Sequence, residues 1–359
     1  MKKIQIFLDA QVMQFHFTGI AKITEKIYDQ PFLHDKVDVQ AVYQGNILGK
    51  ISKKIKLKRF SPLIPRKLWR KVIFPLYLNI KKPSIVHFPW NGSPPFLLKK
   101  SHRVVSTLCD VLPLEIPGFF RDAYSREAYI RSVQKTIDRS SVLFTISKYS
   151  KRQILAHFSV NIPIVILPIG PTLPVIKKSE NKFKWQDYLY VGGYDSRKGL
   201  LNLINVFLDL KENNLISGKL ILVGKINYFS EEFRDKVLKG ANKGYVVERG
   251  YVNDEELSFL YSNAKALIYP SKYEGFGLPP LEAMSHGCPI LTTPFSSIPE
   301  VCGDSALYFD SDEYIDFKNT ILNFDSNEDL RSEMISKGYL QLNKFSWDLA
   351  ATIFINAIK

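Results

Sequence analysis

The sequence predicts an α/β protein with two doubly wound, mostly parallel sheets, each in its own domain. Short apolar runs alternate with longer helical patterns along most of the chain. Most of these runs are continuously apolar, as in strands that helices cover on both faces. The length of 359 residues suits two domains. Residues 170–186 combine prolines, lysines and polar residues without a period, which predicts a linker between the domains.

The predicted elements follow the same βαβ rhythm in both halves. In the first half, we expect strands at 3–10, 37–44, 84–90, 103–108, 141–147 and 162–169. In the second half, we expect strands at 187–193, 219–224, 245–251, 264–270, 289–293 and 306–310, with helices at 199–211, 254–263 and 281–286. Ser346 is a candidate cap for a last helix. The expected division is a first domain, a linker, a second domain and a terminal helix, at 1–170, 171–186, 187–345 and 346–359.

Composition excludes several classes of protein. Apolar residues make up 45% and charged residues 23%, which is the balance of a globular protein rather than a disordered or fibrous one. The three cysteines, at 109, 288 and 302, lack the CxxC spacing of a zinc site and are too few for a disulfide framework. No apolar run is long enough to cross a bilayer. The N-terminus lacks the cleavage site of a signal peptide, so we expect a cytoplasmic protein.

Charge is unevenly distributed along the chain. The net charge is +14, from 49 basic and 35 acidic side chains. Residues 1–175 carry 28 basic and 10 acidic side chains, whereas residues 176–359 carry 21 basic and 25 acidic ones. The basic charge of the first half therefore predicts an anionic partner. Nucleic acid, a membrane surface and a phosphorylated substrate are the alternatives.

The most informative loop, 269–288, begins where a predicted strand ends. It contains Gly275 and Gly277 ahead of a short helix with prolines in its first turn. Glycines before a helix N-terminus let backbone amides approach an anion closely. Glu274 and Glu282 bracket this turn. Because a carboxylate accepts two hydrogen bonds at once, it suits the vicinal diol of a ribose or a hexose.

A second loop should lie at the same sheet edge. After a predicted strand that ends at Gly193, Arg197 and Lys198 precede a helix. Arg grips phosphate oxygens in bidentate fashion, and Lys acts as a compact point charge. The two loops together predict a site for a sugar nucleotide. A glycosidase with paired carboxylates is the competing interpretation of the two glutamates, but it leaves the basic pair without a role.

The second half resembles family 4 of the glycosyltransferases, which has the GT-B fold: two Rossmann-like domains that face a deep cleft. The resemblance rests on an ordered set over about 120 residues, namely YVGGYDSRKG, LILVGK and GYVNDEELSFLYSNAKALIYPSKYEGFGLPPLEAMSHGCPILTTPFSSIPEV. The Glu-x7-Glu spacing within it is typical of that family. In the first half TGIAKITE, HFPWNGSPP, TLCDVLPLEIPGFF and TISKYSKRQI are similar to family segments more faintly. The terminal KFSWDLAATIFINAI resembles the helix that returns to the first domain.

The resemblance implies a role for each matching residue. Arg197 and Lys198 hold the donor diphosphate, Glu274 contacts the donor sugar, and Glu282 binds the ribose hydroxyls. The glycine loop meets sugar or phosphate through Gly275, Phe276, Gly277 and Leu278, and further donor contacts are expected at Gly19 and Gly193. It also implies that the first domain binds the acceptor, that the sugar is transferred with retention, and that neither a metal nor a cofactor is required.

The sequence departs from the family at one position. Many relatives have His-Asp after the strand that ends near residue 108, whereas this chain has Cys109-Asp110. Three interpretations remain: the histidine is dispensable, His16 or His87 reaches the same space, or the enzyme is impaired. Asp110 either orients the acceptor or caps its turn.

A basic segment over 50–71 holds ten Lys or Arg residues and no acid, interleaved with apolar residues. It is either a solvated, flexible loop or a patch that adheres to anionic membranes. The basic residues of this predicted membrane patch are Lys50, Lys53, Lys54, Lys56, Lys58, Arg59, Arg66, Lys67, Arg70 and Lys71. Nucleic-acid binding is the rival interpretation, but no known nucleic-acid module accompanies the segment.

We therefore expect a retaining, metal-independent glycosyltransferase of bacterial surface polysaccharide synthesis, peripheral to the inner face of the cell membrane. Its expected partners are a nucleotide sugar, a lipid-linked or oligosaccharide acceptor and an anionic membrane. GDP-mannose is favoured by what is usual in the family, with UDP and dTDP sugars as alternatives. The alternatives for the function are a catalytically impaired sugar-nucleotide-binding protein, a basic nucleic-acid-binding protein and another GT-B activity such as an epimerase.

Overall fold

The computed structural model describes residues 3–14, 19–47, 52–89, 94–174 and 186–359. Contacts divide the chain into two compact units. Unit 1 comprises Met1–Ile169 and Ser346–Lys359, and unit 2 comprises Gly170–Phe345. Most of the predicted linker, 175–185, lies outside the described residues.

Unit 1 is built on a seven-stranded parallel sheet with the order β3-β2-β1-β4-β5-β6-β7. The strands are β1 (Ile4–Asp9), β2 (Val37–Gln44), β3 (Lys56–Phe60), β4 (Ile85–Phe88), β5 (Arg103–Thr107), β6 (Val142–Thr145) and β7 (Ile164–Ile166). Four of them, β1, β4, β5 and β6, are central and largely buried on both faces, which explains their continuously apolar sequences.

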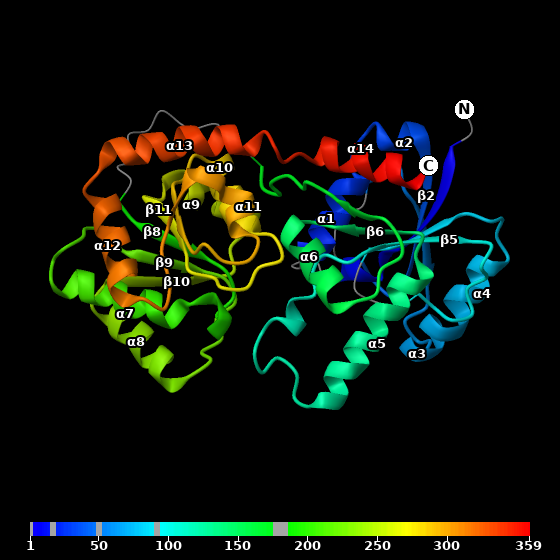
Figure 1. Cartoon of the computed structure of the whole chain (residues 1–359), viewed down its shortest axis with the longest axis horizontal. Coiled ribbons are helices and arrows are strands. Elements are labelled where there is room, and N and C mark those ends of the chain that lie inside the picture. Colours follow the sequence, from blue (N-terminus) through cyan, green and yellow to red (C-terminus); the bar gives the residue numbers. More distant parts are fainter. Residues whose placement is uncertain (1–2, 15–18, 48–51, 90–93, 175–185) are drawn as a thin grey trace. The chain divides into compact units, whose positions relative to one another are not determined.

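Helices cover both faces of this sheet (Figure 1). They are α1 (Gly19–Tyr28), α2 (Leu33–Lys36), α3 (Arg66–Leu68), α4 (Phe74–Asn79), α5 (Ala123–Arg139), α6 (Lys148–His157) and α14 (Trp347–Ile358), with short turns η1 (Ala10–Gln14), η2 (Trp69–Ile73) and η3 (Leu112–Leu114). Ser346 caps α14 by accepting the amide of Leu349. Phe354 of α14 packs against Tyr28, His87 and Phe144, so the end of the chain completes the core of unit 1.

Unit 2 is built on a six-stranded parallel sheet with the order β10-β9-β8-β11-β12-β13. Its strands are β8 (Tyr188–Val191), β9 (Leu220–Val223), β10 (Val246–Gly250), β11 (Ala266–Tyr269), β12 (Ile290–Thr292) and β13 (Ala306–Tyr308). The helices are α7 (Leu200–Glu212), α8 (Glu231–Asn242), α9 (Asp254–Asn263), α10 (Leu278–Ser285), α11 (Ile298–Cys302), α12 (Tyr314–Asp325) and α13 (Glu328–Leu342), with turns η4 (Ser196–Lys198) and η5 (Gly303–Ser305).

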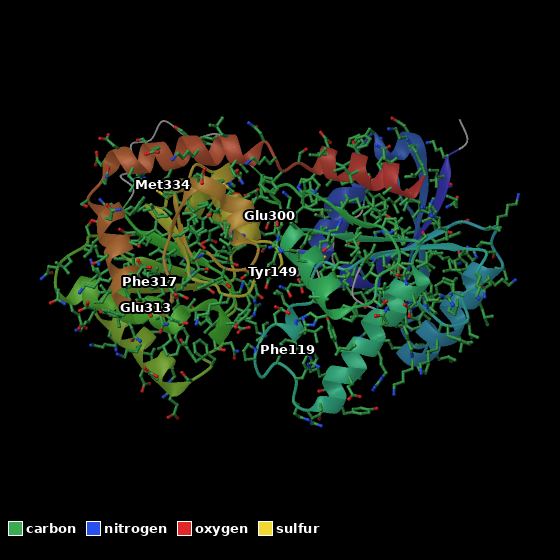
Figure 2. All side chains as sticks on the ribbon, viewed as in Figure 1. Phe119, Tyr149, Glu300, Glu313, Phe317 and Met334 are labelled. Carbon is green, nitrogen blue, oxygen red and sulfur yellow. The ribbon has the colours of Figure 1, made fainter. Side chains whose placement is uncertain are left out.

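Two groups of helices enclose the sheet of unit 2 (Figure 1). On one face α7 packs against α8 and α12, and on the other α10 packs against α9, α11 and α13. Figure 2 shows Phe317 on α12 and Met334 on α13, two members of the large core cluster of unit 2. The α/β class with two parallel sheets is thus confirmed.

The structure departs from the expected elements in the basic segment. No strand was predicted there, yet Lys56–Phe60 forms β3, the edge strand beside β2. Its side chains are exposed apart from that of Phe60, which is half-buried, so β3 lacks the apolar pattern that identifies the other strands. Lysines on an exposed edge hinder pairing with another chain. Residues 56–60 and 66–71 of the basic segment are thus a strand and a helical segment, which corrects their interpretation as a loop. Lys50 lies outside the described residues.

Candidate active site

The expected site lies where the strand order of unit 2 reverses. From β8 the chain proceeds to β9 on one side, and it later returns to β11 on the other side. In open parallel sheets, ligands bind beyond the carboxyl ends of the strands at such a reversal. The loop with Arg197 and Lys198 follows β8, and the glycine loop follows β11. The topology therefore brings the two predicted loops to one place.

Gly199 allows the two loops to pack closely. Its backbone has φ +67°, which L side chains rarely adopt, and a Cβ there would lie 2.4 Å from the carbonyl oxygen of Pro270. Asp195 caps the turn η4 by accepting the amide of Arg197, 3.1 Å away. Together these features hold Arg197 and Lys198 against the end of β11.

Lys198 and Glu274 form a buried ion pair in the described structure. The side chains of Lys198 and Glu274 are 10% and 13% exposed. The Tyr269 hydroxyl accepts from Lys198 Nζ at 3.0 Å and donates to Glu274 Oε1 at 2.7 Å, and Ser271 Oγ donates to the same oxygen at 2.6 Å. All hydrogen bonds that the described residues donate to this carboxylate fall on Oε1. Oε2 therefore remains able to accept hydrogen bonds from a ligand.

The ion pair keeps Glu274 charged. Burial raises the pKa of the Glu274 carboxyl, but the Lys198 ammonium, the Ser271 hydroxyl and Arg197 outweigh burial and lower it. Arg197 lies slightly further away, with Nη1 at 4.0 Å from Glu274 Oε1 and 2.8 Å from the carbonyl oxygen of Tyr273. The cluster thus presents two fixed cations beside one carboxylate.

The glycine loop is held by two serines that follow β12. Ser297 is fully buried, and its hydroxyl donates to the carbonyl oxygens of Glu274 and Phe276, each at 2.8 Å. Ser296, in the left-handed region with φ +56°, accepts the amide of Glu274 at 3.0 Å. These contacts fix the backbone path of 274–276, because both carbonyls point toward Ser297.

The loop then opens α10 directly. Gly277, with φ +113°, precedes its first residue, Leu278. Amides at a helix N-terminus have no intrahelical partner and carry the positive end of the helix dipole. Phe276 is 4% exposed and its ring packs against Phe345. The side chain of Phe276 is thus structural, and its backbone is the part available to a ligand.

Glu282 is more deeply packed than the other site carboxylate. It lies in the first half of α10 and is 6% exposed. Its Oε1 accepts the hydroxyl of Thr172, and its Oε2 lies 3.5 Å from the Tyr261 hydroxyl. A ribose at this carboxylate would compete with Thr172 for Oε1.

Sequence reasoning did not single out Thr172, Tyr269, Ser271, Ser296 or Ser297. Ser296 and Ser297 could have been predicted, because they follow β12, the strand adjacent to β11 in the same sheet. The contact of Thr172 with Glu282 joins residues 110 positions apart and has no local signature.

The two remaining glycines differ in their surroundings. Gly193 is exposed, and a Cβ there would meet no atom within 4 Å. Packing in the described structure therefore does not require glycine at this position. Gly19 is the first residue of α1, after β1, at the point where the strand order of unit 1 reverses.

The residues expected on the acceptor side are mostly buried within unit 1. His87 is 1% exposed, and its ring nitrogens lie 2.7 Å from the Tyr28 hydroxyl and 2.9 Å from that of Thr107. Burial lowers the pKa of His87 to about 3, so its ring is neutral. His87 is a core histidine in this structure, which corrects the expectation that it reaches a ligand. His16 lies outside the described residues.

Cys109 and Asp110 follow β5. Cys109 is 2% exposed, and burial, with the nearby Asp110 carboxylate, raises the pKa of its thiol. A buried neutral thiol does not replace a histidine that donates to a ligand. Asp110 accepts the amide of Leu112 at 3.2 Å and so caps the turn η3.

The described residues contain no group of His, Cys, Asp and Glu side chains that could hold a metal ion. In the same part of the chain, no helix has the length and hydropathy needed to cross a bilayer.

Two doubly wound parallel sheets, with fixed cations and a carboxylate at the reversal of one of them, match the GT-B fold of glycosyltransferases. Residues 172–341 match the model of the family described as glycosyl transferases group 1.

The whole chain resembles known members of this class. It is 29% identical to the O-antigen chain mannosyltransferase B of Escherichia coli over 345 residues, which cover 92% of this chain and 87% of that one. It is 25% identical to the serotype-specific mannosyltransferase WbdA of Escherichia coli over 70% of this chain, and the match spans 33% of that longer protein. The fold matches WaaG, a glycosyltransferase involved in lipopolysaccharide biosynthesis, with a TM-score of 0.73 and 17% identity over 99% of this chain and 98% of that one.

Proposed function

We propose that the protein transfers a hexose, with retention, from a nucleoside-diphosphate sugar to a glycan acceptor of bacterial surface polysaccharide, without a metal ion. The observation that carries this proposal is the cluster of Lys198, Arg197 and Glu274 at the strand reversal of unit 2. It combines the two kinds of group that an activated sugar needs: cations for the diphosphate and a carboxylate for sugar hydroxyls.

The reaction explains why the cations are fixed. The bond between the anomeric carbon and the diphosphate oxygen breaks, and its electron pair leaves with the diphosphate. The acceptor oxygen forms the new bond to the same carbon and loses its proton. Negative charge therefore grows on the diphosphate, where Arg197 and Lys198 stabilise it. Because Tyr269, Asp195 and Gly199 hold both cations in place beforehand, little reorganisation is needed.

The carboxylates and the glycine loop bind the rest of the donor in this proposal. Glu274 accepts from sugar hydroxyls through Oε2, and Glu282 accepts from the ribose. The amides of Gly275, Phe276, Gly277 and Leu278 face sugar or phosphate, with Gly193 and Gly19 as further approaches to the diphosphate. A ribose at Glu282 would share this carboxylate with the Thr172 hydroxyl.

The donor and the acceptor are proposed from the relatives. Both relatives described above are named mannosyltransferases, which favours GDP-mannose over UDP and dTDP sugars. One is named for the O-antigen chain, which favours a lipid-linked glycan as acceptor at the cytoplasmic face of the membrane. We therefore propose that the enzyme works as a peripheral membrane protein without nucleic acid as a partner.

A thermal-shift panel of nucleotide sugars tests the donor site, because a ligand that binds only the folded state raises the melting temperature. We expect GDP-mannose to raise it in the natural protein but not in Lys198→Ala. Lys272→Ala is the matched control, since Lys272 is a nearby lysine that pairs with Asp312 instead. No shift with any nucleotide sugar would contradict the proposal.

The burial of Cys109 favours one second candidate, a sugar-nucleotide-binding protein with little turnover. Release of GDP from GDP-mannose, with and without an oligosaccharide acceptor, separates the two functions. Binding without release under either condition would favour the second candidate.

A further inference from the structure

The helical segment over 66–80 carries an apolar stripe that the described residues of unit 1 leave largely exposed. The short helices α3, η2 and α4 follow one another without a break, and η2 is a π-helix. Leu68, Val72, Leu76 and Ile80 recur at every fourth residue, which places them on one side of the segment. Leu68, Leu76 and Ile80 are 45%, 52% and 78% exposed. This set of four residues is called the outer stripe below.

The opposite side of the same segment is firmly packed. Trp69, Phe74 and Leu78 are buried and belong to a core cluster with β1, β2 and β4. The ring of Trp69 lies 4.5 Å from that of Phe60 and 5.4 Å from that of Phe74. The outer stripe is therefore not the inward face of a loosely attached helix. It is a second apolar face of a helical segment whose other face already packs into the core of unit 1.

A neighbouring loop extends the apolar surface. The Asn79 side chain donates to the carbonyl oxygen of Leu97 at 2.7 Å and accepts the amide of Lys99 at 2.9 Å. These bonds fasten 97–99 to the end of α4, next to Ile80. Phe96 and Leu97 are 89% and 45% exposed. Exposed large apolar side chains that gather on one surface mark an interaction site.

The charge around this surface is almost entirely positive. Residues 51–100 contain thirteen Lys or Arg residues and no Asp or Glu. Lys71, Lys81, Lys82, Lys99 and Lys100 flank the outer stripe and the loop, and all five are exposed. Next to the end of α4 lies a hollow of about 890 Å³ lined in part by Lys3, Lys56, Lys81 and Lys82. Its one carboxylate, Asp38, is paired with Lys56 at 2.8 Å.

We propose that the outer stripe, with Phe96 and Leu97, inserts into the interface of an anionic phospholipid bilayer, while the flanking lysines and the hollow bind lipid phosphates. Apolar side chains framed by lysines suit a bilayer interface, where the side chains enter the acyl boundary and the ammonium groups reach the phosphates. Nucleic acid accepts apolar side chains only as single wedges between base steps, so a continuous apolar stripe fits a bilayer interface better. The proposal gives the basic segment an apolar component that its lysines alone did not indicate.

The inference rests on the proposed function in one respect: a lipid-linked acceptor explains why the enzyme would bind a membrane. The experiment measures co-sedimentation of the full chain with vesicles of phosphatidylcholine, with and without phosphatidylglycerol, in the absence of any nucleotide sugar. Failure of the donor proposal would leave this measurement unchanged. Conversely, loss of vesicle binding would leave the thermal shift by GDP-mannose unchanged.

Three double variants separate the contributions. Leu76→Gln with Ile80→Gln should lower partitioning to anionic vesicles by about tenfold or more, since burying one such side chain corresponds to roughly that factor. Lys81→Gln with Lys82→Gln should weaken binding and reduce its dependence on salt. Ile315→Gln with Leu340→Gln, exposed apolar positions of unit 2, is the matched control and should bind like the natural protein.

A spectroscopic probe reports insertion directly. Phe96→Trp places an indole at the most exposed position of the surface, and its emission should shift to the blue with anionic vesicles. Three results would overturn the proposal. The Leu76/Ile80 variant could bind anionic vesicles as tightly as the natural protein, or the natural protein could bind equally well to vesicles without phosphatidylglycerol. The emission of Phe96→Trp could also stay unshifted with anionic vesicles. Self-association in solution that the Leu76/Ile80 variant abolishes would instead assign the surface to a second copy of the chain.

Discussion

Lys198 and Glu274 are 76 residues apart in sequence, yet their side chains form a buried ion pair at the carboxyl end of adjacent strands. The hydroxyl of Tyr269, a residue that is 1% exposed, bridges the two charges. The pair holds a cation and an acceptor oxygen side by side before any ligand is present. The predictions below test how this arrangement is built and what it does.

Removing the bridging hydroxyl should weaken function more than stability. Tyr269→Phe deletes one hydrogen bond to each charge, and we expect kcat/KM to fall by about tenfold. Tyr188→Phe is the control, because it also removes a hydroxyl bonded to a carboxylate, that of Asp325, but lies at the amino end of β8, the opposite end from the strand reversal. Equal loss of kcat/KM in the two variants would show a general effect of destabilisation.

Substitution by alanine should have different effects on stability at two glycines near the site. Gly199→Ala imposes a left-handed conformation costing about 1–2 kcal/mol and a clash with Pro270, so both Tm and donor affinity should fall. Gly193→Ala meets open space, so its Tm should equal that of the natural protein. A lower thermal shift by GDP-mannose in Gly193→Ala would place the donor beside it, and an unchanged one would remove Gly193 from the proposed site.

The serine beneath the glycine loop should act on donor binding. Ser297→Ala removes both hydrogen bonds to the loop carbonyls, which we expect to lower stability by about 1–3 kcal/mol and to raise KM for the donor more than it lowers kcat. Ser305→Ala removes a buried hydroxyl bonded to the carbonyl of Cys302 and should change Tm alone. An unaltered KM in Ser297→Ala would contradict the positioning role.

The buried histidine predicts a pH dependence of stability. The pKa of His87 is lowered to about 3 in the folded chain, against about 6.5 when unfolded. As pH falls, His87 therefore takes up a proton in the unfolded state before it does so in the folded state. The stabilisation from the neutral His87 ring is complete above pH 6.5 and is lost as pH falls below that value. Tm of the natural protein should drop more steeply between pH 7 and pH 5 than that of His87→Gln.

The same variant tests whether His87 takes part in catalysis. Measured at pH 7.5, where both chains are folded, kcat of His87→Gln should stay within about twofold of the natural value. A large loss of kcat with an unchanged slope of Tm against pH would return His87 to the active site.

Sequence alone predicted the fold class and the strands with apolar cores, because a central parallel strand has a local signature. It missed β3, since an exposed lysine-rich edge strand has no apolar pattern. It also predicted that Glu274, Arg197 and Lys198 share one sheet edge, because loops that follow parallel strands lie at the carboxyl ends of those strands. It could not foresee that Cys109 and His87 are buried or that Thr172 bonds to Glu282, since these depend on tertiary packing.

The most direct test of the account is a calorimetric titration of GDP-mannose into the natural protein, Lys198→Ala and Lys272→Ala. We expect the natural protein and Lys272→Ala to bind with similar Kd, and Lys198→Ala to bind about a hundredfold more weakly, because it loses a charge-assisted contact to the diphosphate and leaves Glu274 without its main partner. Binding by Lys198→Ala with the natural Kd would contradict the central claim that this buried ion pair is the donor site.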